Sequence, residues 1–264
     1  MDTSAAEGVR ALRERRAWVD LSSWIRLLVT GHEAGQFLGD LVSGPVADLV
    51  PGAATRSLLL TPTGRIRADF TVVRVDAGYL LVQDPIQPRS VGDLLAPYLL
   101  SAAVEISDAG ELGSHATVGE RGELAPDTGG GPPPEGLLGV SEPAVEAWRI
   151  LEGRPRFPID LTPESLPHEA DLEHAIDFAK GCYLGQEAVA KVRNLGHPPN
   201  VVLAVRSQGL VEPGAPVTDG AAEVGRVTSA AEDPDGGHAA LIRVRWDARD
   251  APLSAGDGDL RVTG

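Results

Sequence analysis

The sequence predicts an α+β protein that ends in a small all-β domain. Three observations support this class: a helical spacing of apolar residues near position 34, a run of hairpin-forming strands between residues 56 and 84, and a series of short strands after residue 197. The chain has 264 residues, of which 42% are hydrophobic, so it can bury a sizeable core. We expect one large domain over residues 1–196 and a smaller one over residues 197–264.

The first predicted element is an amphipathic helix over residues 34–41. Its apolar residues recur at the i, i+3, i+4 and i+7 positions that such a helix buries. The preceding Thr30-Gly31-His32-Glu33 has the spacing of a capping box, and Gly44-Pro45 ends the helix.

Hairpins follow this helix. Three segments rich in β-branched and aliphatic residues are predicted strands: 56–61, 65–75 and 79–84. The sequences between them, Pro62-Thr63-Gly64 and Asp76-Ala77-Gly78, are typical of turns. A helix over 91–100 and a strand over 103–107 complete a pattern in which helices alternate with antiparallel hairpins.

The rest of the chain contains a loop, two helices and the short C-terminal strands. Residues 127–136, DTGGGPPPEG, are a loop by composition and lack the lysine and hydroxyl residue of a phosphate-binding P-loop. One short helix opens at Ser141-Glu142-Pro143, and a second begins near Gly185. The strands predicted for a small barrel or sandwich are 201–206, 215–217, 223–228, 239–246 and 260–262.

Charge and cysteine content exclude several classes of protein. The formal net charge of −15 has the wrong sign for a protein that grips a phosphate backbone. The one basic cluster, residues 10–16, includes Glu14, and we interpret it as a solvated N-terminal helix. A single cysteine cannot form an internal disulfide, the N-terminal residues do not resemble a signal peptide, and the aliphatic stretches are too short for a membrane span. We therefore expect a cytoplasmic protein.

The segment 180–191, KGCYLGQEAVAK, concentrates rare residues. It contains Cys182, the only cysteine, and Lys180 and Lys191, the only lysines. Amides at the start of the helix near Gly185 and the Lys180 ammonium would both favour the thiolate form of Cys182. The alternative is that Cys182 is a small, buried and inert residue. The residues alone leave these two interpretations open.

Lys-Gly-Cys-Tyr-x-Gly-Gln-Glu, residues 180–187, resembles the signature of the YgfZ-type folate-binding proteins, a branch of the glycine-cleavage T-protein (aminomethyltransferase) superfamily. Four other motifs resemble the family in the same order: FLGDLVS at 37–43, TPTGRI at 61–66, EGRP at 152–155 and VGRVTS at 224–229. The similarity runs over most of residues 20–264.

The resemblance implies T-protein-like interleaved antiparallel α+β subdomains around a central folate channel, with a C-terminal β-barrel beside it. It implies tetrahydrofolate or a one-carbon derivative as the cofactor, and iron–sulfur proteins or their assembly machinery as partners. In bacterial relatives this role includes support for iron–sulfur enzymes that modify tRNA. Because the chain is acidic, we expect that connection to be indirect, without direct tight nucleic-acid binding.

The resemblance also assigns candidate site residues. Cys182 would be the functional centre, with Lys180 beside it. Glu152 matches the glutamate that hydrogen-bonds the pterin ring in T-proteins, since a carboxylate can accept from paired N–H donors. The cofactor-binding candidates are Glu152, Asp69, Tyr183, Gln186, Glu187 and Arg193, although an exposed helix arginine is an equal alternative for the last. The scattered histidines predict no metal site.

Two departures from the T-protein pattern argue against its reaction. Ala68 stands where one of two adjacent carboxylates is expected, and Ser43-Gly44-Pro45 replaces an expected Thr-Asn-Asp triplet. Aminomethyl transfer needs an acid, base or electrostatic partner there. The leading hypothesis is therefore a folate-binding accessory protein for iron–sulfur cluster assembly or repair. The alternatives are a tetrahydrofolate-dependent aminomethyltransferase or methyltransferase/demethylase, and a scaffold without a ligand.

Overall fold

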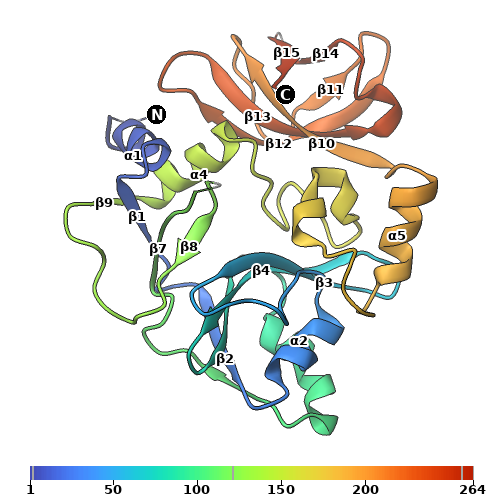
Figure 1. Cartoon of the computed structure of the whole chain (residues 1–264). Helices are drawn as coiled ribbons and strands as arrows, with labels where there is room; N and C mark the ends of the chain where they lie inside the picture. Colours follow the sequence, from blue (N-terminus) through green and yellow to red (C-terminus); the bar gives the residue numbers. More distant parts are fainter. Residues whose placement is uncertain (2, 121, 257, 264) are drawn as a thin grey trace.

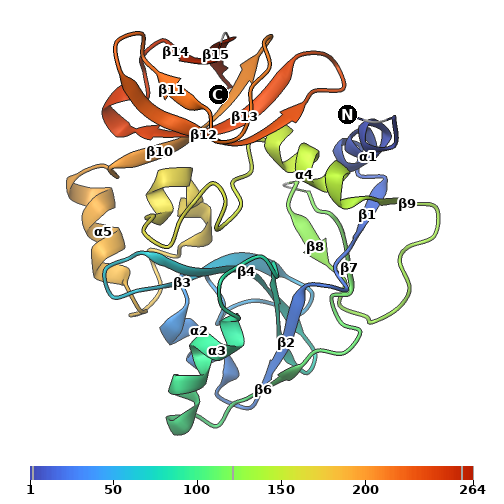
Figure 2. The same ribbon diagram turned by 180° about the vertical axis from the view of Figure 1, so that it is seen from behind.

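The computed structural model describes residues 1, 3–120, 122–256 and 258–263, whose elements form two open sheets, a closed barrel and the helices that pack against them (Figures 1 and 2). The strands of the two open sheets lie between residues 17 and 140, and the barrel is C-terminal. Within the described residues no helix is both long enough and apolar enough to cross a membrane.

The first sheet combines segments from the N-terminus and the middle of the chain. Its strands, in the order β8-β7-β1-β9, are β1 (Ala17–Asp20), β7 (His115–Val118), β8 (Leu124–Pro126) and β9 (Leu138–Val140). Helices α1 (Thr3–Arg13) and α4 (Glu142–Leu151) pack against each other beside it. The predicted N-terminal helix is present and the charged residues Arg10 and Glu14 are exposed, but Val9 and Leu12 on its other face are fully buried in this core.

The second sheet is antiparallel throughout. Its strands, in the order β3-β4-β5-β2-β6, are β2 (Ile25–Thr30), β3 (Ala54–Leu60), β4 (Ile66–Val75), β5 (Gly78–Gln83) and β6 (Glu105–Asp108). The apolar faces of α2 (Ala34–Leu41) and α3 (Val91–Leu95) are buried against this sheet, and α3 continues as the 3-10 helix η1 (Ala96–Ser101). The predicted helices and hairpins of this region therefore agree with the structure to within a few residues.

The predicted capping box before α2 does not form. The N-cap residue of α2 is Glu33, and it makes no side-chain capping bond. Its carboxylate instead accepts a hydrogen bond of 2.6 Å from the backbone N of Ala103, which ties the helix start to the segment before β6. A long-range partner has replaced the local one that the spacing suggested.

The two open sheets are interleaved along the chain. The consecutive strands β1 and β2 belong to different sheets, and the chain returns from β6 in the second sheet to β7 in the first. The pairing of β1 with β9 is parallel, and the other pairs in both sheets are antiparallel. The predicted arrangement of interleaved α+β subdomains is thus confirmed.

A connecting region joins the sheets to the barrel. It contains the 3-10 helices η2 (Pro167–Ala170) and η3 (Leu172–Ala175) and the helix α5 (Gln186–Leu195). Its apolar side chains share one core with Leu58 and Leu60 of β3. Figure 1 shows α5 and the two short helices between the β3–β4 hairpin and the barrel.

The C-terminal strands close into a six-stranded barrel. These strands are β10 (Asn200–Ser207), β11 (Pro216–Thr218), β12 (Glu223–Glu232), β13 (His238–Arg245), β14 (Leu253–Ala255) and β15 (Gly258–Val262). Pairing of β10 with β15 closes the barrel around its own apolar core. Sequence patterns missed β14, whose residues LSA include no β-branched or aromatic side chain. The barrel prediction is confirmed, while the division of the chain at residue 197 stays a prediction.

Candidate functional site

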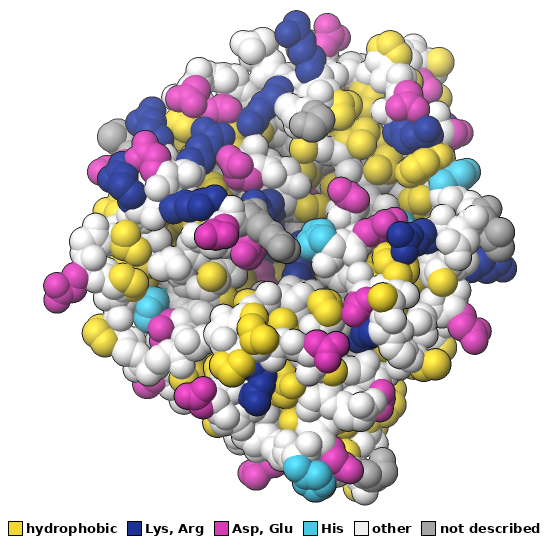
Figure 3. Space-filling view, in the orientation of Figure 1, with side chains coloured by type: hydrophobic (Ala, Val, Ile, Leu, Met, Phe, Trp, Pro, Cys, Tyr) yellow, Lys and Arg dark blue, Asp and Glu magenta, His cyan; other side chains and the backbone are white. Residues whose placement is uncertain are grey.

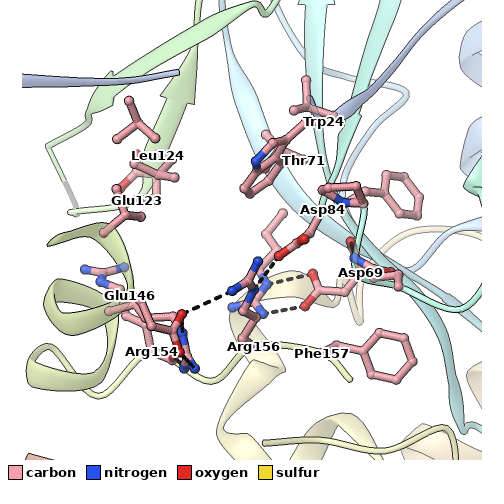
Figure 4. A pocket seen from close by; sticks show the side chains of 18 of the residues that line it. Trp24, Asp69, Thr71, Asp84, Glu123, Leu124, Glu146, Arg154, Arg156 and Phe157 are labelled. Atoms are coloured by element: carbon pink, nitrogen blue, oxygen red, sulfur yellow. Dashed lines mark hydrogen bonds and ion pairs between the residues drawn. The ribbon is translucent and has the colours of Figure 1, made fainter. Parts of the chain in front are cut away.

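A cavity of about 600 Å³ lies at the centre of the molecule. It is bounded by β4 and β5, by the link between β1 and β2, by β8 and α4, and by residues 154–157 (Figure 4). Four aromatic residues border it: Trp24 is half-buried, while the side chains of Phe70, Trp148 and Phe157 are packed into the surrounding cores. Its size and mixed apolar and charged lining are typical of small-molecule sites.

Asp69 faces this cavity from β4. Its carboxylate accepts hydrogen bonds from Arg56 Nε at 2.9 Å and Arg56 Nη2 at 2.5 Å. Gln87 holds the Asp69 backbone in place, because its side chain accepts from the Asp69 N–H and donates to the Asp69 carbonyl. Of the sequence-predicted site residues, which are all described, Asp69 is the one that lines the cavity.

Ala68 does not face the cavity. Its side chain is fully buried in the core that β4 shares with α2. Successive side chains of a strand point to opposite faces, so a carboxylate at this position would enter that core. The absence of a carboxylate at 68 therefore says less about catalysis than the sequence suggested.

A second charged group of the lining comes from α4 and from residues 154–157. Arg156 lies between two carboxylates, with its Nε 2.5 Å from Asp84 Oδ2 and its Nη1 3.1 Å from Glu146 Oε2 (Figure 4). Glu146 also accepts from Arg149, with Nε at 2.7 Å. Burial alone would raise the pKa of Glu146, but the hydrogen bonds and charges of Arg149 and Arg156 outweigh it, so this pKa is lowered.

Arg154 adds a cation to the same wall. Its guanidinium lies over the Trp148 ring, 5.2 Å from the centroid. Burial lowers the pKa of Arg154; the charges of Glu152 and Glu123 oppose this, and that of Arg56 adds to it. Glu152 itself lies outside the lining, where its carboxylate accepts from Arg13 Nε at 2.9 Å.

The segment 180–187, which we call the signature segment, is anchored elsewhere. Lys180 Nζ donates hydrogen bonds to the carbonyls of Gly39 at 3.0 Å and Gly44 at 2.8 Å, and also to that of Val42. The ammonium therefore caps the C-terminal end of α2, where carbonyl groups lack helical partners. Burial lowers the pKa of Lys180 to about 8, against the opposing charges of Asp177 and Asp40.

The glycines of the signature segment fit against the β3–β4 hairpin. Gly185 has φ +86°, and a Cβ there would lie 2.5 Å from the Thr61 carbonyl oxygen. Gly64 in the hairpin turn has φ +77°, and its Cβ would lie 3.0 Å from Ala188 Cβ. Three motifs that are far apart in sequence, at 37–43, 61–66 and 180–187, therefore meet in space.

The other predicted residues of this region surround the signature segment. Cys182 is exposed, so the alternative of a buried thiol is wrong. Tyr183 is buried, its ring lies under Lys180 Nζ at 4.9 Å, and burial raises its pKa to about 12. Arg193 on α5 stacks over the Phe178 ring at 3.9 Å.

Gln186 and Glu187 form the first turn of α5. Gln186 is half-buried and Glu187 is exposed. The structure therefore brings Lys180, Cys182, Tyr183, Gln186 and Glu187 together at one place, and it places Asp69 at another. The ligand-binding roles predicted for these residues stay predictions.

Sequence reasoning missed most of the cavity lining. Glu146 and Arg149 are three residues apart on α4, which is an ordinary spacing for a helix ion pair and gave no signal of a site. Arg154 is the arginine of the EGRP motif and Arg156 follows directly after that motif, so the motif was the signal that could have found this basic pair. Among the described residues there is no group of three or more His, Cys, Asp or Glu side chains that could hold a metal ion.

Comparisons with known proteins agree with this fold and these motifs. The family described as "GCVT N-terminal domain" matches residues 1–111. A glycine cleavage system aminomethyltransferase T from Bartonella henselae has a similar structure, with a TM-score of 0.78 and 18% identity, over 97% of this chain and 88% of that one. At this identity the likeness shows the fold alone.

Proteins that are similar in sequence indicate a narrower class of protein than the fold does. A putative chloroplastic transferase of Arabidopsis thaliana is 26% identical over 87% of this chain, a match that spans 65% of that relative's length. A tRNA-modifying protein YgfZ of Vibrio vulnificus is 39% identical over 28% of this chain and 22% of its own length. A mitochondrial iron–sulfur cluster assembly factor homologue of Phaeosphaeria nodorum is 40% identical over 26% of this chain and 19% of its own.

The fold and the domain match define an aminomethyltransferase-like architecture with a central cavity. Within that class, these comparisons support a GcvT-like protein of the YgfZ type.

Proposed function

We propose that this protein binds tetrahydrofolate, or a one-carbon derivative of it, in the central cavity and supports the assembly or repair of iron–sulfur clusters. The name of the Phaeosphaeria relative, an iron–sulfur cluster assembly factor, supports the second part of the proposal. The name of the Vibrio relative, a tRNA-modifying protein, supports a link to tRNA modification. The observation that carries the first part is the chemistry of the cavity lining.

The lining offers groups that suit a folate. A pterin presents adjacent N–H donors, and the Asp69 oxygens each retain a lone pair beyond the hydrogen bonds from Arg56. Trp24 offers flat apolar surface for one of the pterin and aminobenzoyl rings. Arg154 at the opposite wall provides a cation for the carboxylates of the glutamyl end. The residues present therefore fit the group.

When bound, tetrahydrofolate would supply nitrogen atoms that carry a one-carbon unit. The chain's own contribution would be to orient it and to shield it from water. Asp69 would hold the pterin edge, and its ion pair with Arg56 keeps its charge compensated. A carboxylate held in this way suits positioning better than proton transfer. We therefore favour an accessory protein over a one-carbon transferase, which remains the alternative that the Bartonella fold likeness supports.

The exposed thiol of Cys182 is a second candidate functional group, outside the cavity lining. Cys182 lies on the surface, so a partner protein, a sulfur species or iron could reach it. We propose that this thiol serves the iron–sulfur role while the cavity holds the folate. Because the net charge is −15 and acidic side chains are interspersed among the basic ones on the face in Figure 3, we propose that any effect on tRNA is indirect.

The compartment is also a proposal. A lone cysteine without a disulfide fits a reducing compartment such as the cytoplasm. Two of the relatives are named chloroplastic and mitochondrial, so the compartment varies within this group of proteins.

Calorimetric titration with tetrahydrofolate tests the folate proposal. We expect wild-type protein to bind and Asp69→Asn to bind more weakly by about 1.5–3 kcal/mol, the range for a hydrogen bond to a charged group. Glu152→Ala is the matched control, because Glu152 lies outside the lining. Wild-type protein that does not bind would favour the ligand-free scaffold. Weaker binding in Glu152→Ala with no change in Asp69→Asn would restore the role that the family resemblance gave to Glu152.

A further inference from the structure

We propose that Asp160 is a positioning residue for the central cavity and that strand β12 of the barrel holds it in place. This inference rests on the proposed binding of tetrahydrofolate. It gives the barrel a role in ligand binding, although the cavity itself is lined by the two sheets, α4 and residues 154–157.

Asp160 is fully buried and fully hydrogen-bonded. Its Oδ1 accepts from Thr228 Oγ1 at 2.5 Å and from Ser229 Oγ at 2.7 Å, both on β12. Its Oδ2 accepts from Arg149 Nη1 at 2.8 Å and from the Arg156 backbone N at 2.9 Å. A carboxylate offers about four lone-pair sites, so each of these is used. Asp160 is itself outside the cavity lining.

Arg149 links Asp160 to the cavity wall through hydrogen bonds. Its five N–H groups make five hydrogen bonds: two to Glu146, and one each to Asp160, Ser229 Oγ and the Arg154 carbonyl. Glu146 in turn accepts from the side chain of Arg156. The path from β12 to the cavity is therefore an unbroken series of charged hydrogen bonds.

Without the Asp160 charge, the buried guanidinium of Arg149 would lack one of its counter-charges. Buried charges are tolerated only when paired, so the guanidinium would move or admit water. Either change would displace Glu146 and the backbone of Arg156 together. The cavity would then change shape at the wall that also contains Arg154.

Glu169 provides a matched control. Its side chain is also fully buried, and it accepts from Arg243 Nε at 3.0 Å and Arg243 Nη2 at 2.8 Å, on strand β13 of the barrel. It therefore joins the connecting region to the barrel as Asp160 does. Neither Glu169 nor Arg243 lines the central cavity.

The test compares Asp160→Asn with Glu169→Gln at a temperature where circular dichroism shows both to be folded. We expect both variants to lower the denaturation midpoint in urea. Only Asp160→Asn should weaken tetrahydrofolate binding, by about tenfold or more, because one charged hydrogen bond is of that order. Thr228→Val should weaken binding in the same direction from the barrel side, and Thr228→Ser, which retains the hydroxyl, should restore it.

A readout without ligand separates this inference from the proposed function. The Nε–H protons of Arg149 and Arg156 should exchange slowly by NMR in wild type and in Glu169→Gln, and quickly in Asp160→Asn. Wild-type protein that shows this exchange pattern but no binding would overturn the folate proposal alone. Equal binding, or equal exchange, in the Asp160 and Glu169 variants would overturn the positioning role. If Asp160→Asn does not fold, Thr228→Val and Thr228→Ser test the positioning role instead, by tetrahydrofolate binding and by the exchange of the arginine Nε–H protons.

Discussion

The central cavity and the signature segment differ in how they are built. The cavity wall is made of ion pairs, in which Asp69, Asp84 and Glu146 each bond an arginine. The signature segment instead bonds backbone, since Lys180 donates to carbonyls at the end of α2. The most specific motif of the sequence thus marks a place where chain segments pack, and the cavity is lined by residues with little motif character.

This difference explains why a lysine stands at position 180 in a chain rich in arginine. Three carbonyl oxygens converge on Lys180 Nζ, and a compact ammonium has three donors for them. At the cavity, planar guanidinium groups bond carboxylates, often through two nitrogen atoms, which is the geometry that arginine favours. Lys191 lies exposed on α5. The charge of Lys180 therefore serves packing first, and its influence on Cys182 remains a prediction.

The largest loss of stability is expected from a substitution at Gly185. Gly185→Ala would place a side chain at φ +86° and 2.5 Å from the Thr61 carbonyl oxygen, so the hairpin or the helix start must move. We expect a loss of about 2–4 kcal/mol of unfolding free energy from backbone strain and overpacking. Urea denaturation measures it.

Gly181→Ala is the control for this prediction, because a Cβ there meets nothing within 4 Å and its φ is not in the left-handed region. We expect a change of less than about 0.5 kcal/mol. Similar losses in both variants would contradict the packing role of Gly185.

A smaller effect is expected from Lys180→Met. It would leave the carbonyls of Gly39, Val42 and Gly44 without the ammonium, at a cost of about 1–3 kcal/mol. Lys191→Met, at an exposed position, should change stability by less than about 0.5 kcal/mol. A loss in Lys191→Met as large as that in Lys180→Met would remove the distinction between the two lysines.

The same pair of variants reports a pH dependence. Burial lowers the pKa of Lys180 to about 8 in the folded state, below the ordinary value of 10.5. The unfolded chain then binds more protons between these two values, so wild-type stability should gain from this group as pH rises from about 8 toward 10.5. Lys180→Met should lack this rise and Lys191→Met should keep it. Urea midpoints measured across this window check both.

The smallest effect is expected for the rate of Cys182 alkylation when tetrahydrofolate is added. Cys182 is exposed and lies outside the cavity lining, so saturating tetrahydrofolate should leave its rate of alkylation by iodoacetamide within about twofold. The urea-unfolded protein provides the reference rate. Strong protection by the ligand would show that the cavity and the signature segment act as one site, which would break the comparison.

The parts of this protein that sequence alone could predict depend on local patterns. The helix at 34–41 and the hairpins at 56–84 were predictable because apolar spacing and turn residues act over a few positions. The signature segment was recognisable because its lysine, cysteine and glycines form one specific pattern within eight residues. The short strands β1, β7, β8 and β9 were missed, and the pairing of β1 with β7 and β9 joins segments that are far apart in sequence.

The tertiary structure decided where the charges act. Arg149 joins Asp160, eleven residues away, to Ser229, eighty residues away, and Lys180 reaches carbonyls 136 to 141 residues distant. Such partners depend on how the four cores of the described residues pack together, and no local pattern encodes that. The sequence by itself therefore determined the fold class and the family motifs. Only the folded chain decided that Asp69 faces a cavity, that Ala68 faces a core, and that the barrel reaches the cavity wall through Asp160 and Ser229.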